Sequence, residues 1–199
     1  SQLFKDASNM VDLEMEKFDT SLVTNMSDMF NSASSLETVN LSNFNTKKVT
    51  NMQGMFFYAG MLTELNLSSF DTSMVTDMSN MFNGCYGITS LDVSNLNTSR
   101  VENMSGMFSD MNALTELNIS QLDTSSVTDM SSMFNNLSGL TELDVAHFDT
   151  SKVTDMSNMF NGLGEVTELN LSNFDTRNVV NMSSMFGGMY KIAEFDLSH

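Results

Sequence analysis

The sequence predicts an α/β solenoid, a right-handed stack of 26-residue coils with one short parallel strand and one short helix in each coil. Two observations predict it. The ten residues VTDMSNMFNG stand at 75–84 and again at 153–162, three periods of 26 residues apart. Close variants stand at each of the remaining periods, so seven full repeats and two partial ends fill residues 1–199. Such self-similarity is typical of stacked repeats. The second observation is that the apolar spacing changes within each coil.

The first half of each coil predicts a short helix. Its apolar residues have the i, i+3, i+4, i+7 spacing of one helix face, in the coil at 75–93 as Met78, Met81, Phe82 and Cys85. Asp77 stands before them, where a carboxylate can cap the free N–H groups and face the helix dipole. Asn83-Gly84 supplies residues that tolerate the left-handed conformation in which helices end.

The second half predicts a strand. In ITSLDVS, Leu91 and Val93 alternate with Asp92, as in a strand with one buried face. Stacking the coils makes these strands parallel neighbours about 4.8 Å apart. Eight such sites, from 13–15 to 195–197, would form one sheet roughly 34 Å long by that spacing.

The chain is expected to be a single repeat domain over residues 1–199. Proline is absent and hydrophobic residues make up 41% of the sequence, enough for a core that runs along the stack. The one cysteine, Cys85, excludes an internal disulfide framework and a cysteine metal cluster. No apolar run of 18 residues is present to span a membrane. The chain opens in mid-repeat with SQLFKD, so we expect a fragment of a longer protein.

The segments LTELNLSSFDTSMVTDMSNMFNGC and ITSLDVSNLNTSRVENMSGMF each carry a strand of the L-x-x-L-x-L type followed by M-x-x-M-F. In the coil that starts at Val75 this tail continues to Ile88 as M-x-x-M-F-x-x-C-x-x-L/I. With this pattern the whole chain resembles the BspA-like leucine-rich repeat surface proteins, that is, the 26-residue repeat of bacterial surface proteins. The resemblance implies a non-enzymatic, secreted adhesion module at the cell surface, with its signal peptide and anchor outside this fragment. It also implies a host or microbial surface protein or glycan as partner.

Most unusual residues have a structural interpretation. Fourteen of the 20 methionines occupy the two helix positions of the seven full repeats, which favours core packing over a soft-metal site. Cys85 shares its position with alanine, leucine and methionine, so we expect a buried apolar residue. His147 and His199 share theirs with asparagine, serine and glutamine, which indicates a solvated position. No recurring nucleophile–base pair appears, and we expect no catalytic activity.

A row of Asp-Thr or Asn-Thr pairs, such as Asp71-Thr72 and Asn97-Thr98, recurs in the turn after each strand. We interpret it as a ladder of local hydrogen bonds to the backbone. The alternative is a ligand surface of regularly spaced hydroxyl groups, as in ice-binding solenoids, but the neighbouring positions vary too much for a flat array.

The outward positions of the strands are the candidate ligand-binding site. Glu is a poor strand former, and like charges on adjacent strands destabilise a sheet. Either solubility or ligand recognition would explain why they are kept. The candidate residues are Glu64, Asn66, Ser90, Asp92, Glu116, Asn118, Glu142, Asp144, Glu168, Asn170, Glu194 and Asp196.

The net charge of −17, from 25 acidic against 8 basic residues, excludes nucleic acid or an anionic membrane as a direct partner. Two partners suit an acidic sheet: a basic protein surface, or an anionic polymer bridged by Ca²⁺, the one cofactor considered. Because the sequence pI is about 4.1, acid would also favour self-association. Several bases stand at the turn before the predicted helix, away from the strand face: Lys47, Lys48, Arg100, Lys152 and Arg177.

Two alternatives to an adhesion module remain. The repeats are either a passive stalk or spacer, or a Ca²⁺-dependent array for glycan binding or self-association.

Overall fold

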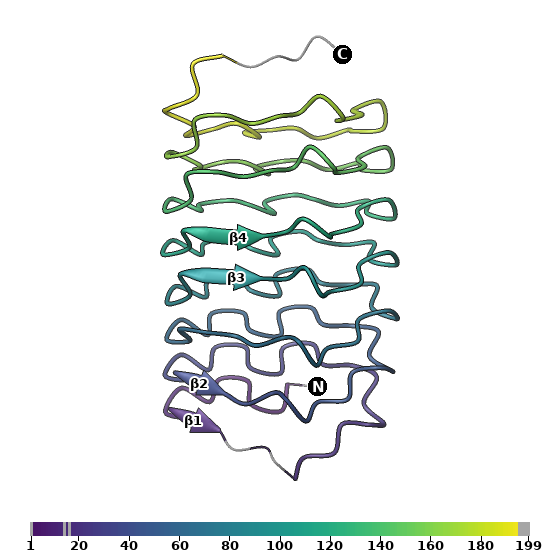
Figure 1. The fold of residues 1–199 in the computed structure, drawn as a ribbon, viewed down its shortest axis with the longest axis vertical. Coiled ribbons are helices and arrows are strands. Elements are labelled where there is room, and N and C mark those ends of the chain that lie inside the picture. The colour runs from purple at the N-terminus through teal and green to yellow at the C-terminus, as the bar shows by residue number, and fades with distance from the viewer. Residues whose placement is uncertain (1, 14, 16, 195–199) are drawn as a thin grey trace.

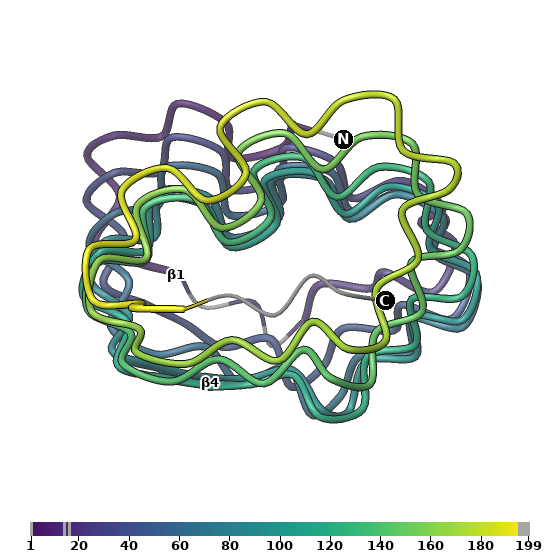
Figure 2. The same ribbon diagram turned by 90° about the horizontal axis from the view of Figure 1, so that it is seen from above.

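The computed structural model describes residues 2–13, 15 and 17–194, which form a column of stacked coils (Figure 1). Seen from above, each coil is a flattened ring lying over the next (Figure 2). The repeat solenoid predicted from the period of 26 residues is therefore present. The content of each coil differs from the prediction in two respects.

The strands are fewer than expected. The described residues contain β1 (Asp12–Leu13), β2 (Thr38–Val39), β3 (Ser90–Asp92) and β4 (Glu116–Asn118). They form two parallel pairs, β1–β2 and β3–β4, each in register one coil apart. The continuous sheet is therefore wrong for these residues, and the last strand site, 195–197, lies outside them. The inward and outward pattern nevertheless holds elsewhere, since Leu143 is buried between exposed Glu142 and Asp144.

The predicted helix is also not formed, since the described residues contain no helix. In each coil, the segment that follows Asp77 or the equivalent Asp or Asn is a run of tight turns. The N–H of Met81 donates to the carbonyl of Met78 within the coil, at 3.2 Å. The next N–H, of Phe82, donates to the carbonyl of Met107 in the following coil, at 3.0 Å. Half of the turn N–H groups thus join one coil to the next.

Backbone dihedrals explain why turns replace the helix. Asn80 and Gly84 have φ of 55° and 75°, whereas a right-handed helix needs negative φ throughout. The first position recurs in every full coil with a residue that tolerates this conformation. Its members are Asp28, Gly54, Asn80, Gly106, Ser132, Asn158 and Ser184.

A ladder through all seven coils lies just before these turns. Parallel bridges join Asn25, Asn51, Asp77, Asn103, Asp129, Asp155 and Asn181 in succession. Asp77 does accept a hydrogen bond from the N–H of Ser79, at 2.9 Å, as a capping residue would. Here the bond closes a turn of the type that Asn and Asp favour.

The core confirms the packing role of the methionines. Of the fourteen repeat methionines only Met182 is exposed, at 48%. A column of phenylalanines runs beside them, with ring centroids 5.4–6.0 Å apart from Phe30 to Phe160. Cys85 is fully buried, and burial raises the pKa of its thiol to about 12. It is a small apolar core residue, as predicted.

Candidate ligand-binding face

The predicted site residues fall into two rows on one exposed face. We call the first the outer row, and its members are Glu64, Ser90, Glu116, Glu142, Glu168 and Glu194. We call the second the Asx row, and its members are Asn66, Asp92, Asn118, Asp144 and Asn170. All eleven side chains are exposed. Asp196 lies outside the described residues.

The side chains of the Asx row accept hydrogen bonds from backbone N–H groups two residues further along the chain. The side-chain Oδ1 of Asn66 accepts a hydrogen bond from the N–H of Ser68 at 3.0 Å. Asp92 accepts from the N–H of Ser94 at 2.9 Å, and hydrogen bonds from the Ser94 side chain and backbone hold the pKa of Asp92 below its usual value. One oxygen in each of these side chains therefore closes the turn that ends the strand, which leaves the outer row as the freer half of the face.

The outer row carries its charge largely unpaired. Ser90 donates a hydrogen bond to Glu116 at 3.2 Å. Glu142 and Glu168 take part in no hydrogen bond or ion pair with the part of the chain that the structure describes. They lie in consecutive coils, at equivalent positions of the repeat. Their carboxylates face solvent and are available to a ligand.

Shallow depressions between the coils bring in threonines that the sequence analysis missed. One depression of about 390 Å³ is lined by Thr141 and Thr167 together with Glu142 and Glu168. Another, of about 400 Å³, lies over β1 and β2 beside Glu64. The recurring Thr-Glu pair in LTELN, LTELD and VTELN was the available signal. It passed unnoticed because strict alternation would have placed the threonine on the buried side.

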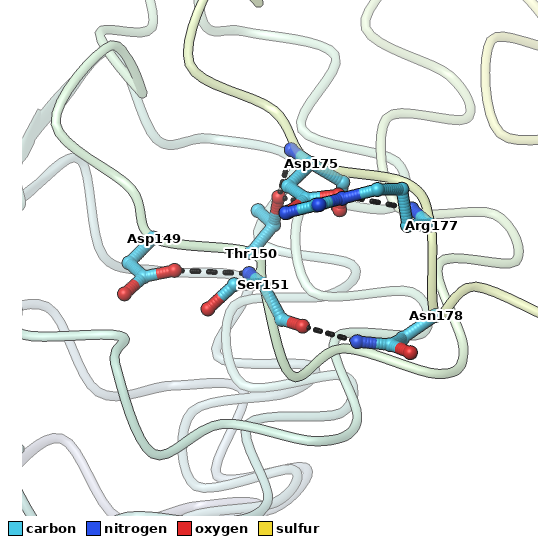
Figure 3. A network of polar contacts seen from close by, with 6 residues as sticks. All are labelled: Asp149, Thr150, Ser151, Asp175, Arg177 and Asn178. Carbon is cyan, nitrogen blue, oxygen red and sulfur yellow. Dashed lines mark hydrogen bonds and ion pairs between the residues drawn. The ribbon is translucent and has the colours of Figure 1, made fainter.

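The Asp-Thr row is structural, as predicted. Figure 3 shows Thr150, whose hydroxyl donates to the carbonyl of Asp175 at 3.1 Å and accepts from the N–H of Asp175 at 2.7 Å. Asp149 accepts from the N–H of Ser151 at 2.9 Å, and Asn178 donates to the carbonyl of Ser151 at 2.7 Å. The Thr150 hydroxyl therefore bridges two coils. Because Thr150 is also 0% exposed, it cannot contact a ligand.

Arg100, Lys152 and Arg177 have their contacts away from the outer row. Arg177 pairs with Asp175 at 2.5 Å, and its side-chain hydrogen bonds lower the pKa of Asp175 to about 2. Arg100 and Lys152 line a separate depression of about 550 Å³ beside Thr128. No basic residue lines either of the two depressions described above on the strand face. The predicted separation of charge is confirmed for these residues.

Other kinds of site are not found in the described part of the chain. No three His, Cys, Asp or Glu side chains among these residues gather as they would around a metal ion. His147 is exposed and packs edge-on against the ring of Phe148. No helix in the described ranges is long and apolar enough to cross a bilayer.

Comparisons with known proteins place the repeat in a family. The family described as "Mycoplasma protein of unknown function, DUF285" matches residues 1–116 and again 84–198. No curated protein matches the chain. Among solved structures, the Treponema pallidum leucine-rich repeat protein has a TM-score of 0.46 at 14% identity, over 96% of this chain and 69% of that one. The functional domain of InlJ from Listeria monocytogenes has a TM-score of 0.25 at 17% identity, over 95% and 49%.

Proposed function

The chain belongs to the DUF285 family, and from this premise we propose that it is a non-enzymatic adhesion module of a cell-surface protein. Its ligand site is the strand face, and within that face the outer row. The ligand is a protein or glycan of a host or microbial surface. A basic protein surface fits the chemistry best.

One observation carries this proposal: of the three polar rows described, the outer row has the side chains that the fold uses least, with Ser90 and Glu116 joined by one hydrogen bond. In the Asp-Thr row, the threonine hydroxyls bridge coils and the Asp or Asn side chains close turns. The side chains of the Asx row also close turns. Glu142 and Glu168 bond to nothing described, yet they stand side by side with like charge. Like charges at stacked positions repel each other, so a benefit outside the fold is needed to explain them.

The mechanism is multipoint electrostatic contact. Carboxylates repeated once in each coil meet lysine or arginine side chains of the partner, and each exposed pair is weak alone. The net charge of −17 steers a basic partner toward the chain and disfavours anionic ones. The net negative charge falls as the pH approaches the sequence pI of about 4.1, so the repulsion between chains weakens and self-association is favoured in acid.

The test compares two variants of equal charge. The first carries Glu116→Gln, Glu142→Gln and Glu168→Gln on the outer row. The second removes three charges from the Asp-Thr row by Asp71→Asn, Asp123→Asn and Asp149→Asn, at positions where other coils already have asparagine. Binding to immobilised extracellular proteins and mucin is measured by biolayer interferometry, with Ca²⁺ and with chelator.

We expect the outer-row variant to lose at least tenfold in affinity and the second variant to bind as the unmodified chain does. Equal loss in both would reduce the effect to net charge and contradict a site on the strand face. Loss of binding with chelator would favour the Ca²⁺-dependent array. If the unmodified chain binds no member of the panel, the spacer function is favoured, which the uninterrupted ladder through seven coils also suits.

A further inference from the structure

A groove away from the strand face breaks the uniformity of the repeat. It has a volume of about 680 Å³ and lies where the turns after the phenylalanine column meet across the first coils. Tyr58, Tyr86 and Met61 give it an apolar side, and Asp6, Ser8 and Ser34 give it a polar one. The chain has only three tyrosines, and two of them are here.

The two tyrosine rings are held in place by glycines. A Cβ atom at Gly84 would stand 2.8 Å from the ring of Tyr58, and one at Gly60 would stand 3.0 Å from the ring of Tyr86. Each ring therefore covers a position where a neighbouring coil has no side chain. The ring centroids are 5.9 Å apart with an interplanar angle of 56°. Even so, Tyr58 and Tyr86 remain 40% and 42% exposed.

Tyr58 also has an unfavourable backbone conformation. Its φ is 55°, in the left-handed region that bulky residues avoid. Other coils have small or short polar residues at this position, namely Asp6, Ser32, Gly84, Asp110, Asn136, Gly162 and Gly188. Backbone strain of this kind tends to occur at functional sites. The packing of the fold does not require a tyrosine there.

The polar side of the groove is neutral or acidic and has free hydrogen-bonding groups. The side chains of Asp6, Ser8 and Ser34 make no hydrogen bond with the described residues. The neighbouring Lys5 is turned to Asp28, 3.7 Å away, and the groove lining includes no base. An anionic ligand would therefore meet no counter-charge. A purely apolar ligand would cover these polar groups without satisfying them, which is costly.

We propose that this groove binds a neutral saccharide. A sugar ring has an apolar C–H face that can lie on the two tyrosine rings, and hydroxyl groups that can donate to Asp6 and exchange hydrogen bonds with Ser8 and Ser34. The volume lies within the usual range of small-molecule sites, roughly 300–1,000 Å³. This site is separate from the outer row and does not depend on the function proposed for it.

The experiment uses the whole chain with galactose-, glucose-, mannose- and N-acetylglucosamine-terminated oligosaccharides as probes. Binding is measured by saturation-transfer NMR and by tyrosine fluorescence, which is informative because the chain has no tryptophan. The variants are Tyr58→Ser and Tyr86→Ser. Each introduces the residue that another coil has at the equivalent position, Ser32 for Tyr58 and Ser34 for Tyr86. Tyr86→Phe retains the ring, and Tyr190→Ser removes the tyrosine that does not line this groove.

We expect at least one probe to bind, with affinity falling at least tenfold in Tyr58→Ser and Tyr86→Ser. Tyr86→Phe, which keeps the ring, should lose less affinity than Tyr86→Ser, and Tyr190→Ser should bind within twofold of the unmodified chain. None of these variants alters the outer row, so failure of the outer-row proposal would leave this result unchanged. Circular dichroism confirms that each variant folds. Absence of saccharide binding, or unchanged binding in both groove variants, overturns the proposal. Binding of tetramethylammonium or a lysine peptide in place of sugars also overturns it, since the groove would then be a cation site.

Discussion

Replacing Ser132 by glycine distinguishes the turn stack from the helix that the sequence predicts, because the two structures give the change opposite signs. Ser132 has φ of 56° and its hydroxyl makes no hydrogen bond with the described residues. In a helix, glycine would be worse than serine by about 0.5 kcal/mol. At a left-handed position, glycine relieves a steric penalty of about 1–2 kcal/mol.

The net effect follows from two opposing contributions. Glycine gives the unfolded chain extra freedom worth about 0.5–1 kcal/mol, which subtracts from the relief of strain. We therefore expect Ser132→Gly to raise the free energy of unfolding by up to about 1.5 kcal/mol, with a central value of about 0.7 kcal/mol. Ser184 has the same φ of 56° two coils away, so the double variant should gain roughly twice as much.

The assay is equilibrium urea unfolding followed by far-ultraviolet circular dichroism, with the slope of free energy against urea compared between variants. The control is Ser138→Gly, since Ser138 is exposed and has no positive φ. This control should lower stability by about 0.4–1 kcal/mol, because glycine gives the unfolded chain extra freedom and no strain is relieved. If Ser132→Gly lowers stability as the control does, the left-handed conformation at this position is refuted, and with it the explanation for the missing helix.

Three further predictions concern the core, the threonines of the Asp-Thr row and the dependence of stability on pH. Phe108→Ala, in the middle of the phenylalanine column and 0% exposed, should lower the free energy of unfolding by about 3–5 kcal/mol in urea titrations. Phe186 continues the column beyond Phe160, with ring centroids 6.0 Å apart, but is only partly buried, so Phe186→Ala should cost less, and an equally small effect of Phe108→Ala would contradict a continuous stack. Thr98→Val retains shape but leaves the N–H of Asp123 without the hydroxyl that it donates to at 2.8 Å, so thermal or urea unfolding should show a loss of about 1–3 kcal/mol. The pKa of Asp175 is lowered from 3.8 to about 2 in the folded chain, so its contribution is fully present above pH 3.8 and is lost as pH falls toward 2. Melting temperatures from pH 2 to 6 should therefore fall less steeply for Asp175→Asn, and parallel curves would show that the Arg177 pair does not stabilise the fold.

The sequence alone determined the repeat, its length and the residues that face the core. An exact period fixes which residues stack on one another, because equivalent positions in successive coils meet their own copies. Met78, Met81 and Phe82 could be assigned to the core, and Thr72 and Thr98 to a structural row, without any coordinates. These assignments depend on burial and on local turn chemistry, which a repeating pattern shows directly.

Only the tertiary structure decided the backbone conformation of the first half of each coil, which carries the core methionines and phenylalanine. The spacing of Met78, Met81, Phe82 and Cys85 suits one helix face, but the same side chains also point inward from consecutive turns. What separates the two is the sign of φ at Asn80 and the hydrogen bonds from Phe82 to the next coil, and both depend on neighbouring coils being present. The clue in the sequence was the restriction of that position to Gly, Asn, Asp and Ser.

The candidate site divides in the same way. Exposure and charge of the outer row followed from the repeat, but the occupation of the Asx row by its own backbone did not, because Asn66 and Glu64 are equally polar in the sequence. The groove at Tyr58 and Tyr86 was also invisible to the pattern. Its residues come from different coils and different repeat positions, and only stacking brings the rings to 5.9 Å over two glycines. The sequence determines what repeats, and the packing of coil on coil decides which of the remaining side chains are free to bind.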